Sequence, residues 1–198
     1  MVIVSPWTRG GWVCSEVFDH TSVLRLIEAR FGEAMRETNI SAWRRAVCGD
    51  LTSAFDFSKR GDMRVKLPDT KRYKEETDAA CRVLPDPAAP AKGAQPVQER
   101  GTRPARAIPY QLNVDAVVDG ETLRLDFLNE GKAGAVFQVY CADGARRPWV
   151  YTVESGKRLS DEWRLGTVSE EERGIVDAAG RYGLSVHGPN GFLRTVEG

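Results

Sequence analysis

The stretch "YQLNVDAVVDGETLRLDFLN", residues 110–129, decides the fold of the C-terminal half of this chain. Apolar and polar residues alternate on both sides of Asp119-Gly120, a dipeptide that favours tight turns between antiparallel strands. A period of two is typical of strands that bury one face. The stretch therefore predicts a β-hairpin.

Further segments of the same kind follow the hairpin. They read "AVFQVYCA", "RPWVYTVE", "KRLSDEWRL", "YGLSVHG" and "GFLRTVE", separated by turn signals at Glu130-Gly131, Asp143-Gly144, Ser155-Gly156 and Pro189-Asn190-Gly191. Roughly seven short strands at this spacing predict an antiparallel β-sandwich over residues 108–198. Residues 169–180 are predicted to form a short helix or loop between strands.

Residues 59–107 have a different composition. Residues 59–74 carry seven basic and two acidic residues, and residues 84–109 hold six of the ten prolines. Proline disfavours helices and interior strands, so we interpret this zone as a linker, with a short helix near residues 71–83 capped by Thr70. The basic run is either a solvated face or a phosphate site, and apart from Tyr73 no aromatic residue interleaves with it as in nucleic-acid sites.

Residues 1–58 are rich in apolar and aromatic side chains. Residues 2–4 are predicted to form a strand buried on both faces. Asp19 is placed to cap a helix through the backbone N–H near Ser22, Gly32 to end that helix, and Ser41 to cap a second one. The first helix carries one apolar stripe, which consists of Val23, Leu24, Ile27 and Phe31. Since 58 residues cannot bury so much apolar surface alone, the zone is predicted to be a piece of an α/β domain.

Composition excludes several classes of protein. Lys+Arg and Asp+Glu balance at 28 each among 198 residues, so no overall charge points to nucleic acid. No apolar run is long enough to form a transmembrane segment, and the N-terminus lacks the pattern of a secretion signal. The four cysteines, Cys14, Cys48, Cys81 and Cys141, form no C-x-x-C pair, and with two histidines they predict no structural zinc site. Both free thiols and disulfides remain open, and the pairing does not follow from the sequence.

Two pairs of residues are the candidates for function. Asp19 and His20 precede a predicted helix N-terminus, where His20 is either a hydrogen-bond donor or general acid near a phosphate, or a partly buried polar residue beside a capping aspartate. Trp149 and Trp163 form either a ligand-binding or membrane-facing patch on the sandwich, or part of its core. The other histidine, His187, is expected at the end of a strand. No catalytic triad, phosphate-binding glycine loop or metal site can be assigned.

Several longer motifs resemble one enzyme family. "IVSPWTRGGWVCSEVFDHTSVLRLIEARFG" (3–32) and "NISAWRRAVCGDLTSAFDF" (39–57) are similar to the end of the catalytic domain of bacterial phosphocholine-preferring phospholipases C, which are related to phosphatases of the alkaline-phosphatase superfamily. "LPDT" (67–70), "PVQERGTRPARAIPYQL" (96–112) and "YGLSVHGPNGFLRTVEG" (182–198) resemble the linker and the β-rich C-terminal module of the same family.

The resemblance implies an α+β chain. It begins with the incomplete C-terminal edge of an α/β phosphatase-like domain (1–58), continues through a linker (59–107) and ends in an antiparallel β-sandwich (108–198). The family's reaction is hydrolysis of phosphatidylcholine-type phosphodiesters to diacylglycerol and phosphocholine, with a divalent metal possible in the catalytic domain. Of the family's motifs, only "FDHTS" (18–22) carries over, and the nucleophile and metal ligands are expected upstream of this chain.

Two hypotheses follow for the role of the chain. In the first, it is a fragment of a secreted or periplasmic phospholipase C, with phospholipid as the substrate of the parent enzyme, the upstream catalytic region as its partner and the export signal also upstream. On that reading the chain alone is inactive. In the second, the β-sandwich is a non-catalytic module that binds lipid head groups, a membrane surface or a protein partner.

Overall fold

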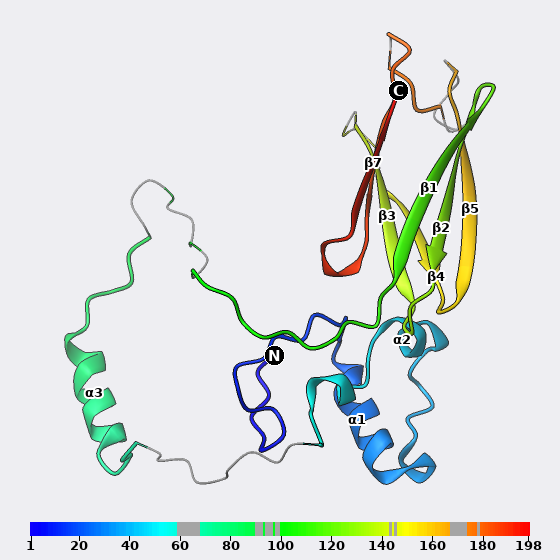
Figure 1. The fold of residues 1–198 in the computed structure, drawn as a ribbon. Coiled ribbons are helices and arrows are strands. Elements are labelled where there is room, and N and C mark those ends of the chain that lie inside the picture. The colour runs from blue at the N-terminus through cyan, green and yellow to red at the C-terminus, as the bar shows by residue number, and fades with distance from the viewer. Residues whose placement is uncertain are drawn as a thin grey trace.

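The computed structural model describes residues 1–58, 68–89, 93, 97, 100–142, 144, 146–166, 174–177 and 179–198. Figure 1 shows an elongated β-structure standing on a group of short helices, with a long segment of chain extending to one side. The order of elements is helices first and strands second, as the sequence predicts for an α+β chain.

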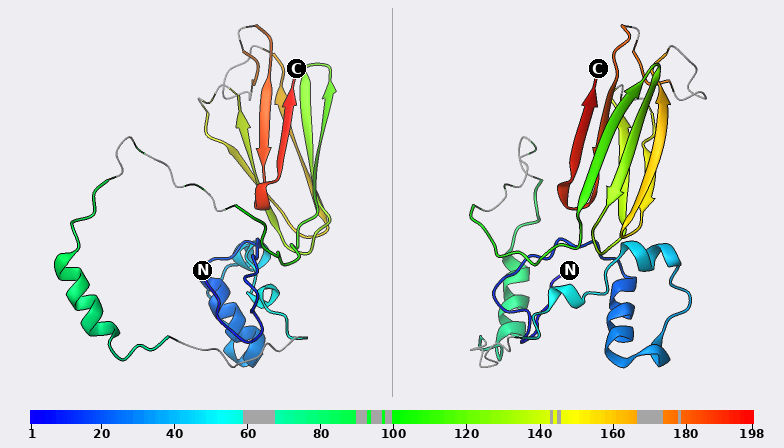
Figure 2. Two further views of the ribbon diagram at one scale, coloured as in Figure 1. Left: turned by 60° about the vertical axis from the view of Figure 1, so that its left-hand side comes forward. Right: turned by 45° about the vertical axis from the view of Figure 1, so that its right-hand side comes forward.

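Seven antiparallel strands form the C-terminal part. They are β1 (Leu112–Asp119), β2 (Thr122–Asn129), β3 (Ala135–Cys141), β4 (Trp149–Val153), β5 (Lys157–Arg164), β6 (Gly183–His187) and β7 (Leu193–Glu197). One sheet has the order β1-β2-β5 and the other β4-β3-β6-β7, and the two views of Figure 2 show them packed face to face. This confirms the predicted β-sandwich.

The core lies between the two sheets. In β2, Leu123, Leu125 and Phe127 are fully buried, while the residues between them point outward. Phe127 contacts Phe137 of the other sheet, with ring centroids 5.3 Å apart. The alternation visible in the sequence is therefore the alternation between core and surface, and it fixes the register of the strands.

A buried asparagine joins the sheets at one end. Asn129, at the end of β2, donates through Nδ2 to the carbonyl oxygens of Ala133 (2.8 Å) and Val153 (3.0 Å). Its Oδ1 accepts from the N–H of Gly131 at 3.0 Å. Because Val153 belongs to β4, the side chain ties the β2–β3 loop to both sheets.

The turns follow the sequence signals where the structure describes them. Gly120 has a φ of 57° between β1 and β2, and Gly156 has a φ of 69° between β4 and β5. A 3-10 turn, η5 (Pro189–Gly191), joins β6 to β7. The turn predicted at Asp143 and the acidic part of the 169–180 connection lie outside the described residues. In the described part of that connection, Gly174 forms a bridge with Arg164, and Val176 forms one with Tyr182, so this part joins the strands instead of forming a helix.

The N-terminal part is built from α1 (Thr21–Phe31), η1 (Glu33–Met35), α2 (Ala42–Val47) and η2 (Thr52–Ala54). Gly32 ends α1 with a φ of 84°, and the Ser41 side chain caps α2 by accepting from the N–H of Arg44 at 3.3 Å. Both helix boundaries agree with the prediction.

The predicted strand over residues 2–4 is wrong. These residues form no strand, and Val2 and Val4 are 89% and 94% exposed. A strand needs a hydrogen-bonding neighbour, and among the described residues no strand lies beside this one. The apolar stripe of α1 is also uncovered, with Phe31 64% exposed.

A bidentate ion pair holds α1 to α2. The guanidinium of Arg45 bonds both carboxylate oxygens of Glu28, at 2.8 and 2.9 Å, and the carbonyl oxygen of Glu37 at 2.6 Å. Glu28 also accepts from the N–H of Glu37 at 2.7 Å. The hydrogen bonds from Arg45 and Glu37 lower the pKa of Glu28 to about 2.

The zone between the two parts contains α3 (Tyr73–Val83), as predicted. Its N-cap is Arg72 instead of Thr70, although the Thr70 carbonyl accepts from the N–H of Tyr73 at 3.1 Å. None of its residues is buried. Much of the basic run and of the proline-rich stretch lies outside the described residues.

The segment between residues 56 and 104, called the excursion below, is bonded at both ends to the loop at residues 7–13. On the outgoing side, the N–H of Asp56 donates to the carbonyl of Trp7 at 2.9 Å. On the returning side, Val13 exchanges backbone hydrogen bonds with Pro104 (2.9 Å) and Arg106 (2.8 Å). The chain therefore leaves and rejoins the helical part at neighbouring points.

Three contacts fix the helical part to the sandwich. The Trp43 indole N–H donates to Thr152 Oγ1 at 2.9 Å, and the N–H of Gly134 donates to the Ala46 carbonyl at 2.7 Å. The N–H of Val17 donates to the Tyr110 hydroxyl at 2.9 Å. A Cβ on Gly134 would lie 2.9 Å from the Ala46 oxygen, so this close approach requires glycine.

Candidate functional site

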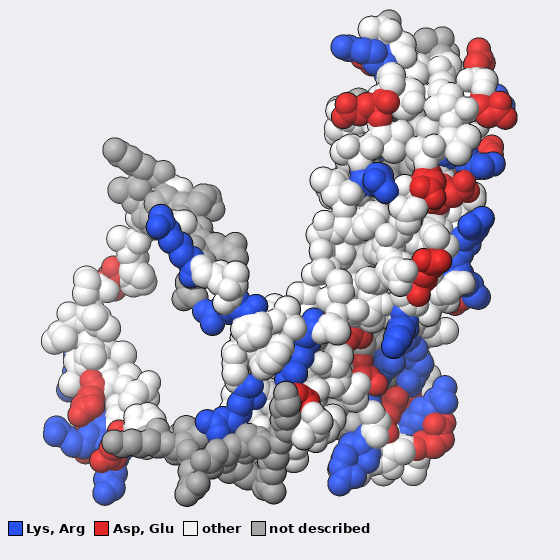
Figure 3. All heavy atoms as spheres, viewed as in Figure 1, with Lys and Arg blue, Asp and Glu red and all other residues white. Residues whose placement is uncertain are grey.

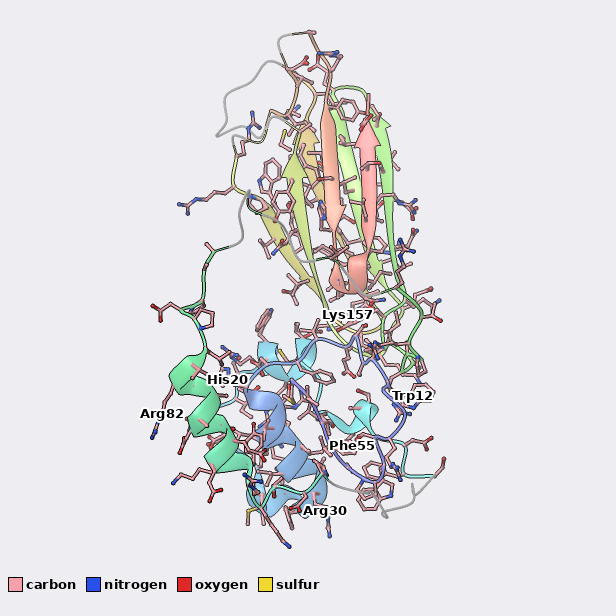
Figure 4. The ribbon with its side chains drawn as sticks, turned by 90° about the vertical axis from the view of Figure 1, so that its left-hand side faces the viewer. Trp12, His20, Arg30, Phe55, Arg82 and Lys157 are labelled. Carbon is pink, nitrogen blue, oxygen red and sulfur yellow. The ribbon has the colours of Figure 1, made fainter. Side chains whose placement is uncertain are left out.

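A cavity of about 700 Å³ adjoins the predicted Asp19–His20 site. Its walls come from the first twenty residues together with Leu51, Ala54 and Arg106. Its ionisable groups include Arg9, Glu16, Asp19, His20 and Arg106. Figure 4 shows His20, Trp12 and Phe55 in this part of the molecule, beneath the end of the sandwich that carries Lys157.

Asp19 is fully engaged at the start of α1. Its Oδ1 accepts from the backbone N–H of Thr21 (2.8 Å) and from the Thr21 hydroxyl (2.6 Å), and its Oδ2 pairs with Arg44. Its own N–H donates to the hydroxyl of buried Ser22 at 3.1 Å. Burial raises the pKa of Asp19, but the bonds from Thr21 and Arg44 outweigh burial, and the pKa lies below its ordinary value. The carboxylate thus stays ionised and anchors the helix.

Two details differ from the sequence prediction. The helix N-cap is His20, and Asp19 bonds the N–H of Thr21 instead of that of Ser22. His20 is exposed on the cavity wall, where the structural interpretation expected it to be partly buried. The pairing of Asp19 with Arg44 crosses 25 positions, so no local pattern in the sequence predicts it.

A second polar cluster borders the same cavity, and the sequence did not predict it. The Ser53 hydroxyl bonds the Glu16 carboxylate and lies 3.6 Å from the Cys14 sulfur. Gly49 packs directly against this carboxylate, since a Cβ there would lie 2.2 Å from Glu16 Oε1. The Glu16 carboxylate and the Cys14 thiol line the cavity, and the Ser53 hydroxyl joins them from η2. The cluster ties the loop before α1 to η2, which is a structural role.

The tryptophans lie in the sandwich. Trp163 is 1% exposed and packs edge-to-face on half-buried Trp149, with centroids 5.5 Å apart. Tyr151 completes the cluster, 6.4 Å from Trp163, and bonds Asp161 through its hydroxyl. The Trp163 ring thus fills the space between the sheets. His187 ends β6, as expected, and contacts the Tyr140 ring.

The structure holds all four cysteines as free thiols, with Cys48 and Cys141 buried, Cys14 half-buried and Cys81 exposed. Within the described ranges, no three His, Cys, Asp or Glu side chains gather as metal ligands would. None of the helices in the described part has the length and apolar character that crossing a bilayer requires.

Comparison with known families shows which proteins the two ends of the chain resemble. Residues 104–198 match the family described as bacterial phospholipase C, C-terminal domain, and residues 1–33 match the phosphoesterase family. The sandwich and the segment that leads into it are thus similar to the C-terminal domain of bacterial phospholipases C, and the N-terminal segment is similar to phosphoesterase sequences.

Individual relatives match along the whole chain. It is 50% identical over 202 residues to a non-hemolytic phospholipase C of Pseudomonas aeruginosa and 48% identical to one of Burkholderia pseudomallei. It is 41% identical over 223 residues to a hemolytic phospholipase C of Pseudomonas aeruginosa. These alignments cover all of this chain but 27%, 27% and 30% of the respective relatives, so the chain spans less than a third of their length.

Proposed function

We propose that this chain is the C-terminal part of a phospholipase C that hydrolyses phosphatidylcholine-type phosphodiesters to diacylglycerol and phosphocholine. The observation that carries the proposal is the match of the entire chain to phospholipases C at up to 50% identity among the three relatives named above. The two family matches, one at each end, support the same arrangement.

In this proposal the catalytic groups lie in the preceding phosphoesterase region. The carboxylates of the cavity support this, because Asp19 and Glu16 are already occupied by Arg44 and Ser53. The parent enzyme is proposed to use a divalent metal. The described side chains do not fit a metal site, so we assign no step through a metal to them. Export of the parent to the periplasm or the medium remains a prediction.

The role proposed for the present chain is to complete and support the phosphoesterase domain. Its exposed apolar side chains concentrate in the matched segment and just after it, including Val2, Val4, Phe31 and Met35, at 89, 94, 64 and 56% exposure. Surfaces of this kind are usually covered by protein. The upstream region is the proposed cover, and it would supply the neighbouring strand that residues 2–4 lack.

The test is a chimera. This chain replaces the matching segment of the non-hemolytic phospholipase C of Pseudomonas aeruginosa, and hydrolysis of phosphatidylcholine and of p-nitrophenyl phosphorylcholine is measured for the chimera and for the isolated chain. We expect the chimera to be active and the isolated chain to be inactive. Turnover by the isolated chain, or a folded but inactive chimera, would contradict the proposal.

A further inference from the structure

The two outer faces of the sandwich differ in charge. The outward positions of β1, β2 and β5 carry many charged residues, namely Asp115, Asp119, Arg124, Asp126, Arg158, Glu162 and Arg164. Figure 3 shows charged side chains gathered along this side of the sandwich, over β2 and β5. A charged outer face is what a solvated sheet is expected to have.

The other outer face is nearly without charge. Its outward positions on β3, β4, β6 and β7 are Val136, Gln138, Tyr140, Val150, Thr152, Ser185, His187, Leu193 and Thr195, which we call the uncharged face, together with Gly183 and Glu197 at one end. Across these four strands, Glu197 is the one outward Asp, Glu, Lys or Arg. Charged residues make up 28% of the chain, so a sheet face with a single charged outward residue is depleted of charge in the way that the cores of protein interfaces are.

Polar groups on the uncharged face bond to one another. The Tyr140 hydroxyl donates to Gln138 Oε1 at 2.8 Å, and His187 Nε2 lies 3.2 Å from the Ser185 hydroxyl. The rings of Tyr140 and His187 meet edge-to-face at 5.2 Å. Polar groups that already have hydrogen-bond partners in the protein lose fewer hydrogen bonds when water is removed. This face can therefore be covered at a low desolvation cost. Val150 and Leu193 remain 58% and 57% exposed beside them.

The uncharged face continues an interface that already exists. At one end, Thr152 accepts the indole N–H of Trp43 from α2. Next to this contact, a cavity of about 390 Å³ lies between Val17 and Trp43 on one side and Val136 and His187 on the other. The helical part thus already covers the near end of the face, and the remainder extends beyond it.

We propose that the uncharged face is the surface on which the upstream phosphoesterase region packs in the longer protein. This rests on the proposed function, which places such a region before residue 1. The phosphoesterase match covers residues 1–33, which belong to the helical part beneath the sandwich. An upstream phosphoesterase region joined to residue 1 would therefore lie next to the uncharged face. The absence of cations on the face disfavours an anionic membrane as the occupant.

Hydroxyl-radical footprinting tests the proposal without relying on activity. Oxidation of Tyr140, His187 and Leu193 is compared between the isolated chain and the chimera described above. We expect oxidation of all three to fall about 5-fold or more in the chimera, because interface cores exclude water. Oxidation of Val117, which is 44% exposed on the outer side of β1, should not change.

A matched pair of variants tests the same surface. Val150→Asp and Val117→Asp each place a carboxylate on an edge strand, at positions 58% and 44% exposed, in different sheets. Both should leave the thermal unfolding of the isolated chain nearly unchanged. In the chimera, Val150→Asp should restore the oxidation of Leu193 to the level of the isolated chain, while Val117→Asp should leave Leu193 protected.

Two results would overturn the proposal. One is equal oxidation of the three residues in the chimera and the isolated chain. The other is protection in the isolated chain on adding phosphatidylcholine vesicles but not in the chimera, which would assign the face to a membrane. If the exchange impairs folding of the chimera, the same footprint is read at the aligned positions of the native relative. Activity reports separately on the proposed function, since an active chimera with an unprotected face would refute only the docking.

Discussion

At the scale of single residues, the ion pair between Glu28 and Arg45 links stability to pH. The pKa of Glu28 is about 2 in the folded chain, below its ordinary value of 4.5. A carboxyl group with a lowered pKa adds stability that is fully present above the ordinary value and is lost as the pH falls toward the folded value. The contribution of Glu28 is therefore expected to disappear between about pH 4.5 and pH 2.

The substitution Glu28→Gln tests this dependence. The variant should unfold at a lower temperature than the wild-type chain at pH 7, and the difference should narrow as the pH falls below 4.5. Glu33→Gln, which alters an exposed pair with Arg36, is the control and should show little effect. A difference for Glu28→Gln that stays constant from pH 7 to pH 3 would refute the assignment.

Gly134 is the second residue whose role is specific. A Cβ at this position meets the carbonyl of Ala46, so Gly134→Ala should force α2 away from the sandwich and cost about 1–3 kcal/mol in the free energy of unfolding. Gly166→Ala is the matched control because open space surrounds Gly166. Chemical denaturation measures the free energy of unfolding of both variants. Hydrogen exchange at the N–H of residue 134 should accelerate only in Gly134→Ala.

Single residues also mark where sequence reasoning reaches its limit. The caps at Ser41 and Gly32 depend on neighbours a few positions away, and both were predicted. Asp19 was correctly placed at a helix start, but its partner Arg44 and the Glu16–Ser53 contact join residues 25 and 37 positions apart. No pattern of spacing encodes such pairs, because they form only when the loops fold together.

At the scale of elements, the strands of the sandwich were predictable because their signal is local. Alternation and turn residues lie within each hairpin, and burial follows the alternation, as in β2. Residues 2–4 have equally good strand composition and form none. The difference lies in strand pairing. β2 pairs with β1 and β5, whereas none of the described strands pairs with residues 2–4.

The connection between the two sheets depends on Asn129. Asn129→Ala should leave the carbonyls of Ala133 and Val153 without this donor inside the protein, at a cost of roughly 2–4 kcal/mol in the free energy of unfolding. Urea denaturation measures the loss, with Asn39→Ala on the surface as the control. A loss below that of the control would mean that water replaces the side chain.

At the scale of the whole molecule, the helical part and the sandwich form one unit despite the long excursion between them. Trypsin should cleave first at exposed basic residues around α3, such as Lys74 and Arg82, since no residue of α3 is buried. The two products should remain together in size-exclusion chromatography, held by the bridge of Val13 with Pro104 and Arg106 and by Trp43. Separation of the products under native conditions would refute this unity.

This unity was not predicted from the sequence. The composition of residues 59–107 predicted a linker, and it gave no sign that residues 104–106 bond directly to the loop that precedes α1. A change in composition marks where the chain lacks regular structure, but it carries no information on where the ends of that stretch meet. The family matches place the same residues in the C-terminal domain, beginning at residue 104.

The anchoring of residues 56 and 104–106 to one short loop has a consequence for evolution and engineering. Because the exit and re-entry points are fixed independently of what lies between them, the intervening stretch is free to gain or lose amino acids without shifting the rest of the protein. The entropy cost of closing a loop rises only slowly with the length of the loop. The alignment with the hemolytic relative extends over 223 positions, against 198 residues here. We predict that the additional positions fall in this stretch.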